Sequence, residues 1–385
     1  MRSTFNGLST MVRGIMANQL SLDTTGHNIV NAGTEGYSRQ SVNLVATRCQ
    51  MVGTARGDAA LGTGVDAMSI TRARSVYADR QYRAEVAIQE RYDVLQMNYD
   101  KLETIFNDSD DTGIQNAMTL FWKSLESLSA NSSDPDYRRN VISQAGNLVN
   151  MIQLAASELQ DQIADEYNEI SMRVEEVNHI TEEIVNLNKQ ITAMEVTGAT
   201  ANDLRDQRDL LVDSLSKFMD ITTSENAEGR YAVITNGVTL VSGVSRLTLE
   251  YSRSISSAID DVNYGVSDHS IEIAETKIIL RPLSGSLRGN FDAIDECKSY
   301  IDKLANISTL MLTTFNEQHK AGYDLNGNLG DNFFGESGYT YGEVRIDDNT
   351  TDYPYITKDG EKITGIDIIN ELKVGLTFNQ ANLIA

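Results

Sequence analysis

Proline, cysteine and positive charge are all scarce in this sequence, and each shortage excludes something. With only three prolines in 385 residues, very long stretches carry no helix-breaking residue, so long helices are permitted. The two cysteines, Cys49 and Cys297, lie far apart and outside any Cys-x-x-Cys or Cys/His spacing. The sequence therefore predicts neither a disulfide framework nor a zinc site.

The charge balance is strongly acidic, because 55 Asp and Glu residues outnumber 32 Lys and Arg residues and give a net charge of −23. Such a chain repels phosphate backbones and anionic lipid surfaces, so we expect neither nucleic acid nor a membrane as a partner. No apolar run reaches membrane-spanning length, and polar residues interrupt the N-terminus every few positions. By these criteria alone the protein is cytoplasmic, and any export must use a route without a cleaved signal.

The N-terminal segment has the pattern of an amphipathic helix. Residues 5 to 29 place apolar side chains at a three-four spacing, at Phe5, Leu8, Val12, Ile15, Leu22 and Ile29. Gln19 and Gly26 interrupt this stripe, so the helix needs a packing partner to be stable. From residue 33 to residue 64 glycines recur and Val42, Leu44 and Val45 lie among polar residues, which predicts an extended loop or hairpin.

Helical patterns dominate the next part of the chain, over residues 72 to 106, 114 to 128, 140 to 197 and 202 to 218. The third of these carries two apolar tracks that repeat every seven residues. One track is Val177, Ile184 and Ile191, and the other is Ile180, Leu187 and Met194. Heptad tracks of this kind predict a coiled-coil seam, whose partner lies in this chain or in another.

After residue 218 the sequence pattern changes. β-Branched residues alternate with polar ones around an Asn236-Gly237 turn, which is typical of a hairpin. We expect an elongated, multi-domain α+β subunit with a long coiled-coil-like helical region and inserted β-rich domains. Its expected segments are an N-terminal helix and motif (1–40), a long-helix region with a hairpin (41–218), a β-rich insert (219–289), a return helix and loop (290–334) and a second β-rich element (335–385).

Candidate chemistry is sparse. Four isolated histidines, His27, His179, His269 and His319, are expected to be structural, because none has a metal-ligand spacing to another ligand. The loop after Asp324 resembles a calcium loop but lacks the required glycine and glutamate, so an Asx turn is expected. The charged run of residues 203 to 209 is expected to be a solvated helix face with intrahelical pairs. We therefore expect no catalysis, no metal and no cofactor.

A motif near the N-terminus resembles the signature of flagellar rod, hook and hook-associated proteins. It reads Asn-Ile-x-Asn and then Thr-x-Gly-Tyr-x-Arg, and its residues are Asn28, Ile29, Asn31, Thr34, Gly36, Tyr37, Arg39 and Gln40. Many relatives carry proline at the position of Glu35. Tyr37 and Arg39 are the candidates for subunit contacts, with closure of the turn as the alternative role.

Later segments narrow the resemblance. The stretches GTGVDAMSITRARSVYADRQYR, NDLRDQRDLLVDSLS, TNGVTLVSG and FNEQHKAGYDLNGNLGDNFF are similar, in order and spacing, to the hook-associated protein 1 family. The resemblance implies a structural subunit of the hook-filament junction that self-associates in a helical ring. It also implies contacts with the hook protein, with hook-associated protein 3 and with an export chaperone, and secretion through the flagellar type III apparatus to the extracellular flagellum.

In that family a C-terminal helix pairs with the N-terminal helix, and this sequence ends at Ala385 before such a helix. The expectation is therefore of a truncated chain that is not competent to form the junction as it stands. Two alternatives stay open. One is another axial subunit, such as a hook or distal rod protein, and the other is a cytoplasmic coiled-coil scaffold, which the heptads and the acidity alone would also suit.

Overall fold

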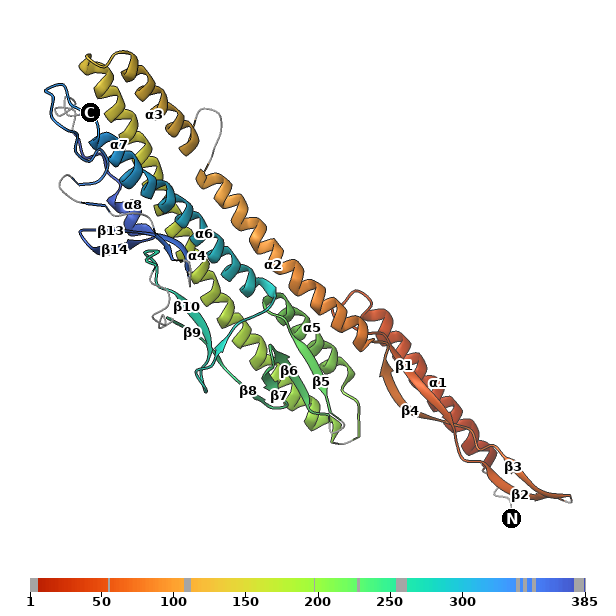
Figure 1. Ribbon diagram of the computed structural model, residues 1–385. Helices are drawn as coiled ribbons and strands as arrows, with labels where there is room; N and C mark the ends of the chain where they lie inside the picture. Colours follow the sequence, from red (N-terminus) through yellow and green to blue (C-terminus); the bar gives the residue numbers. More distant parts are fainter. Residues whose placement is uncertain are drawn as a thin grey trace.

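The protein is elongated, with a small N-terminal arm at one end of a long helical body (Figure 1). The computed structural model describes residues 6–54, 56–106, 112–196, 198–226, 229–253, 262–336, 340–341, 345–347, 351–376 and 384. We call residues 6 to 72 the arm and the elements from residue 76 onward the body. The α+β class expected from the sequence is confirmed.

Helices make up most of the body, and the arm has one helix. The arm contains α1 (Asn6–Val30). The body contains α2 (Val76–Phe106), α3 (Gly113–Ala130), α4 (Pro135–Glu195), α5 (Asn202–Phe218) and α6 (Gly285–Leu310), a π-helical turn (Met311–Phe315), α7 (Asn316–Lys320) and α8 (Ile366–Glu371).

The strands form small antiparallel sheets. In the arm, β1 (Gln40–Ala46) pairs with β4 (Val65–Arg72), and β2 (Gln50–Thr54) pairs with β3 (Gly57–Leu61), which confirms the expected hairpin. In the body, one sheet has the order β5 (Thr222–Glu225), β6 (Tyr231–Thr235), β7 (Val238–Ser242) and β8 (Ser245–Arg246). Two further sheets comprise β9 (Leu249–Arg253), β10 (His269–Ile273) and β11 (Ile279–Leu280), and β12 (Arg345–Asp347), β13 (Thr351–Lys358) and β14 (Glu361–Thr364).

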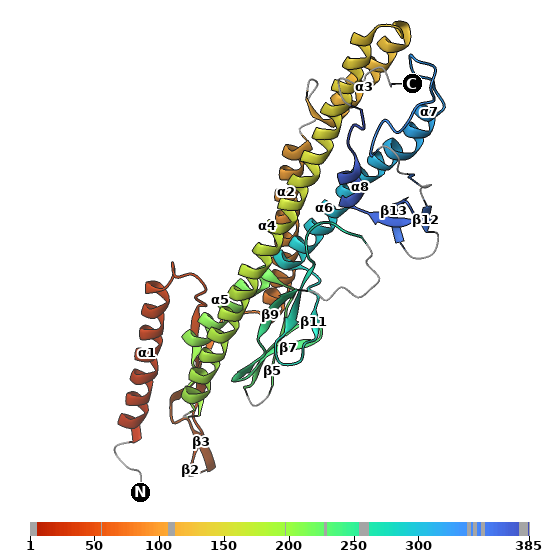
Figure 2. The ribbon, with the colours of Figure 1, turned by 90° about the vertical axis from the view of Figure 1, so that its left-hand side faces the viewer.

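Helix α4 is the spine of the body and runs along almost its whole length (Figures 1 and 2). Its 61 residues make it about 90 Å long at 1.5 Å per residue. The helix starts cleanly because Pro135 occupies its first turn and the Asp134 carboxylate accepts the N–H of Asp136 at 2.9 Å. Along its length α4 packs against α3, then α6, then α5, so this one helix connects the other long helices of the body.

The predicted seam lies on the part of α4 that faces α5 and the sheets. Val177, Ile180, Ile184 and Ile191 are buried within this chain, Leu187 is partly buried, and Met194 is 48% exposed. The partners are α5 and the edge of the β-rich insert, since Asn178 bonds the backbone of Leu249 and Asn188 bonds that of Gly243. The covered part of the stripe is therefore packed by a mixed surface rather than by a second long helix.

Some segment boundaries in the structure differ from those expected from the sequence. Helix α6 begins at Gly285, inside the segment assigned to the β-rich insert, because the serine-glycine pair at 284 and 285 makes a turn against α5. The second β-rich element also contains the short helix α8. Phe5, the helix-breaking stretch 107–111 and most of the last nine residues lie outside the described residues.

A glycine permits the close approach of α2 and α6. A Cβ built at Gly289 would lie 2.8 Å from the carbonyl oxygen of Arg91 and 2.8 Å from Cβ of Val94. We expect Gly289→Ala to lower the free energy of unfolding by about 1–3 kcal/mol, because the helices must separate to make room.

The matched control for this substitution is Gly146→Ala, since nothing lies within 4 Å of a Cβ at that helical position. This change is expected to raise stability by about 0.5–1 kcal/mol, because alanine loses less backbone entropy than glycine on entering a helix. Urea denaturation followed by circular dichroism measures both values. Equal effects of the two substitutions would contradict the packing argument.

Candidate functional site

The predicted motif forms the turn that joins α1 to β1. The side chain of Asn28 bridges this turn, because its Nδ2 donates to the Gln40 carbonyl at 2.8 Å and its Oδ1 accepts the Gln40 N–H at 2.8 Å. The Tyr37 hydroxyl donates to the same Oδ1 at 2.8 Å. Asn31 extends the network, since its Nδ2 bonds the His27 carbonyl and its Oδ1 accepts the Thr34 hydroxyl. Asn28 thus fixes the direction in which β1 leaves the helix.

The turn then docks on α5. The backbone at Gly36 has φ of +77°, a conformation that suits glycine, and a Cβ there would lie 3.2 Å from Cβ of Leu210. Two residues later, the Ser38 N–H donates to Oδ2 of Asp206 at 2.9 Å. The Gln40 side chain donates to Asp203 at 2.7 Å. The motif is therefore bound by a surface 170 residues further along the chain.

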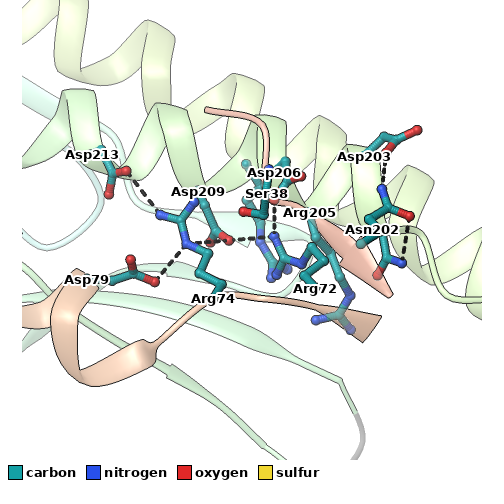
Figure 3. Close-up of polar contacts among 12 residues, drawn as sticks. Ser38, Arg72, Arg74, Asp79, Asn202, Asp203, Arg205, Asp206, Asp209 and Asp213 are labelled. Atoms are coloured by element: carbon teal, nitrogen blue, oxygen red, sulfur yellow. Dashed lines mark hydrogen bonds and ion pairs between the residues drawn. The ribbon is translucent and has the colours of Figure 1, made fainter. Parts of the chain in front are cut away.

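We call this surface the carboxylate face of α5; it consists of Asp203, Asp206, Asp209 and Asp213. Because these residues are three or four positions apart, they lie on one side of the helix (Figure 3). Their partners come from the arm and from the start of α2. The ion pairs are Arg72 with Asp206 and Asp209 (2.6 and 2.9 Å), Arg74 with Asp79, Asp209 and Asp213 (2.7, 3.5 and 3.1 Å), and Arg83 with Asp213 (2.6 Å).

The expectation that residues 203 to 209 form a solvated helix face is wrong. Asp206 is only 4% exposed, and Asp209 and Arg208 are buried as well. Their ion pairs reach other elements rather than neighbours on the same helix. Burial alone would lower the pKa of Arg74, but the hydrogen bond to Asp79 and the nearby Asp209 raise it overall. Burial, reinforced by Asp203 and Asp206, also raises the pKa of Tyr37.

Two arginines on the neighbouring side of α5 bond to the body. Arg208 is 2% exposed, with its guanidinium carbon 3.7 Å from the centre of the Tyr231 ring and Nη1 donating to Asn188 at 3.1 Å. Arg205 pairs with Glu195 at 2.7 Å and with Glu225 at 3.0 Å. Helix α5 thus carries carboxylates that bond the arm and α2, and guanidinium groups that bond α4 and the β5–β8 sheet.

We call the place where the arm meets α5 the joint. Beyond it, α1 packs on β1 and β4 and presents its other side outward (Figure 2). Leu8, Ile15, Leu22 and Ile29, which are seven residues apart, are all exposed, Leu22 and Ile29 by 72% and 71%. A groove of about 730 Å³ runs between the C-terminal half of α1 and β1 and is lined by motif residues such as Asn28 and Tyr37. An exposed apolar face of this length is typical of a protein-binding surface.

The structure divides the predicted motif into two groups. Asn28, Asn31, Thr34, Gly36, Tyr37 and Gln40 make the internal contacts of the turn, whereas Ile29 and Arg39 have exposed side chains. The Tyr37 hydroxyl bonds Asn28, which favours the turn-closing alternative for this residue. Sequence reasoning missed Arg72, Arg74 and the carboxylate face as parts of this site; the available signal was the three-residue spacing of the aspartates.

The remaining candidates are structural in the described residues. The Asp324 carboxylate accepts the N–H groups of Asn326 and Asn328 at 2.8 and 2.7 Å, which confirms the Asx turn. His269 stacks on Tyr251 with ring centres 4.8 Å apart, and buried His319 contacts the backbone of Asp331. Cys49 and Cys297 are unpaired, and burial raises the pKa of the Cys297 thiol to about 12.

Among the described residues, no group of three or more His, Cys, Asp and Glu side chains is arranged to hold a metal ion. No described helix has both the length and the apolar character that a membrane crossing requires.

Known proteins resemble this chain in both sequence and fold. Residues 99–334 match the family described as flagellar hook-associated protein FlgK helical domain. The chain is 32% identical to flagellar hook-associated protein 1 of Bacillus subtilis, covering 88% of this chain and 71% of that protein. It is 31% identical to flagellar hook-associated protein 1 of Salmonella typhimurium, covering 83% of this chain but only 58% of that protein.

Among solved structures, the flagellar hook junction protein FlgK from Burkholderia pseudomallei has a similar fold, with a TM-score of 0.62 and 18% identity. The similarity covers 80% of this chain and 66% of that one. The matched helical domain comprises the body from within α2 to the end of the Asp324 loop. The chain therefore belongs to the flagellar hook-associated protein 1 family, whose members are structural proteins of the bacterial flagellum.

Proposed function

We propose that this protein is a structural subunit of the junction between the hook and the filament. Membership of the flagellar hook-associated protein 1 family supports this role. The observation that carries it in the structure is the exposed apolar face of α1, held outward by a turn that the carboxylate face of α5 binds. A subunit that buries such a face on assembly gains hydrophobic free energy only in the assembled state.

The proposal extends to partners. The subunit self-associates in a helical ring and contacts the hook protein on one side and hook-associated protein 3 on the other. On this proposal the protein leaves the cell through the flagellar type III apparatus, escorted by an export chaperone. The coiled-coil tracks and the acidity alone would also fit a cytoplasmic scaffold, but a scaffold does not call for the axial motif around Asn28.

Deletion of the gene tests this function. Cells without it are expected to carry bare hooks in electron micrographs and to release flagellin into the medium, because filament subunits have no junction on which to assemble. The gene supplied in trans should restore filaments, and the protein should then be found in sheared flagella. Normal filaments in the deletion strain, with the protein retained inside wild-type cells, would return the scaffold to first place.

A further inference from the structure

We propose that the carboxylate face of α5 is the positioning element of the arm, and that Asp206 is its central residue. On this proposal Asp206 fixes the direction in which α1 leaves the body, and so the direction in which the apolar face of α1 points. The proposed junction role does not explain why the aspartates of the carboxylate face are buried, and positioning of the arm gives them a role. It rests on that role only for its cellular consequence.

The first step is the way in which the chain enters and leaves the arm. It passes the joint twice, once in the turn before β1 and once at the end of β4. The Asp206 carboxylate holds both passages, because Oδ2 accepts the N–H of Ser38 at 2.9 Å and Oδ1 accepts Nη1 of Arg72 at 2.6 Å (Figure 3). The two passages are also joined to each other, since the Ala73 N–H donates to the Arg39 carbonyl at 2.8 Å. One side chain therefore ties both passages to α5.

The second step is that neighbouring contacts brace the same point from two sides. Asn202 donates to the Ile70 carbonyl at 3.0 Å and approaches the Gln40 side chain at 3.3 Å. Asp209 gives Arg72 a second carboxylate at 2.9 Å. Contacts with fixed donor and acceptor directions restrain an angle, whereas apolar contacts permit sliding. The joint is thus built to hold one orientation.

The third step is burial. The side chain of Asp206 is 6% exposed and that of Arg72 is 15% exposed, so added salt screens this pair much less than it screens a surface pair. At the joint Leu210 lies against Gly36, which has no side chain to add apolar area. The arm itself stands beside the body with α1 clear of the long helices (Figure 2). Removing the carboxylate would therefore release the arm while leaving the core of the body intact.

A distance measurement on the purified full chain tests the proposal. Spin labels at Asn18→Cys on α1 and Asn186→Cys on α4 occupy exposed positions, and Cys49→Ser removes the exposed native thiol. Pulsed electron resonance should give one narrow distance for this background. Asp206→Ala should lose it and give a broad distribution, while the thermal unfolding of the body stays near that of the background.

Two further variants keep the test decisive. Arg72→Gln removes the same ion pair from the arm side, so it serves if Asp206→Ala fails to fold. Asp292→Asn removes a partly buried carboxylate, which pairs with Arg91 at 2.6 Å away from the joint, and should keep the narrow distance. An unchanged narrow distance in both Asp206→Ala and Arg72→Gln would overturn the proposal, as would equal broadening in Asp292→Asn.

The cellular readout separates this inference from the junction role. If both are right, cells that carry only the Asp206→Ala allele export the protein but shed flagellin as the deletion strain does. A deletion strain with normal filaments would remove the junction role and leave the distance result standing. A deletion strain with bare hooks, combined with full filaments in the Asp206→Ala strain, would overturn the positioning of the arm as a requirement for assembly.

Discussion

Replacing Asn316 by leucine is expected to lower the free energy of unfolding by about 3 kcal/mol, one of the two largest effects that we predict for a single side chain. The Asn316 amide is buried, and it uses both its donor and its acceptor. Its Nδ2 donates to the carbonyls of Leu312 and Phe334 at 2.9 and 2.7 Å. Its Oδ1 accepts the N–H groups of Phe333 and Phe334, each at 2.9 Å.

These bonds join the end of the long α6–α7 helix to the segment that follows the Asp324 loop. Phe333 and Phe334 are fully buried and pack with Phe121 and Phe315. Leucine has nearly the size of asparagine but cannot pair with the backbone, so buried N–H and carbonyl groups would lose their partners. The π-helical turn just before Asn316 shows that the backbone already departs from regular α-helix at this point.

Urea denaturation measures the loss, and Gln318→Leu is the matched control. Gln318 carries the same kind of side chain two residues further on, but it is exposed. That substitution should change stability by less than about 0.5 kcal/mol, as is usual for surface positions. A loss of the same size in both variants would show that leucine disturbs the helix itself rather than the hydrogen bonds of Asn316.

The second large effect is expected at Arg208. Changing it to leucine should cost about 3 kcal/mol, because the change removes a buried cation from the face of Tyr231 and leaves Asn188 without its donor. Burial lowers the pKa of Arg208, and the phenol ring and Glu225 counteract this, so the pairing keeps the guanidinium charged inside the core. Thermal unfolding followed by calorimetry measures the change.

Arg205→Leu provides the comparison for Arg208. Arg205 lies on the same side of α5 and pairs with Glu195 and Glu225, but its side chain is 18% exposed and Glu225 is 29% exposed. Water can replace part of what these more accessible ion pairs lose, so the cost should stay below about 1.5 kcal/mol. If Arg205→Leu lowered stability more than Arg208→Leu, burial would not determine how much each arginine contributes to the free energy of unfolding.

Much of the helical architecture could be predicted from the sequence. The absence of proline over residues 140 to 197 predicted one very long helix, and α4 confirms it. The segment assigned to residues 202 to 218 coincides with α5, because apolar periodicity and flanking turn residues both mark its ends. Such features depend on neighbours within one or two turns of helix, which the sequence displays directly.

The joint could not be predicted in the same way. Ser38 and Asp206 are 168 residues apart, and nothing local to either residue indicates the other. A run of alternating charges predicts a solvated helix face, since most such runs lie on the surface. Only the fold reveals that α5 is enclosed between the arm and the β5–β8 sheet. The heptad spacing likewise continues to Met194, whose side chain is 48% exposed although α5 reaches the next residue through the Arg205–Glu195 pair.

The uninterrupted length of α4 has a mechanical consequence. A continuous α-helix that is packed on several sides resists stretching and sharp bending far better than segments joined by loops, because such deformations must break consecutive backbone hydrogen bonds. A push on the end that carries α3 is therefore transmitted to the end that carries α5 with little loss. In the junction role that we propose, a subunit of this shape would act as a strut under rotation, and the contacts of Asp206 would set the direction in which the arm receives the load.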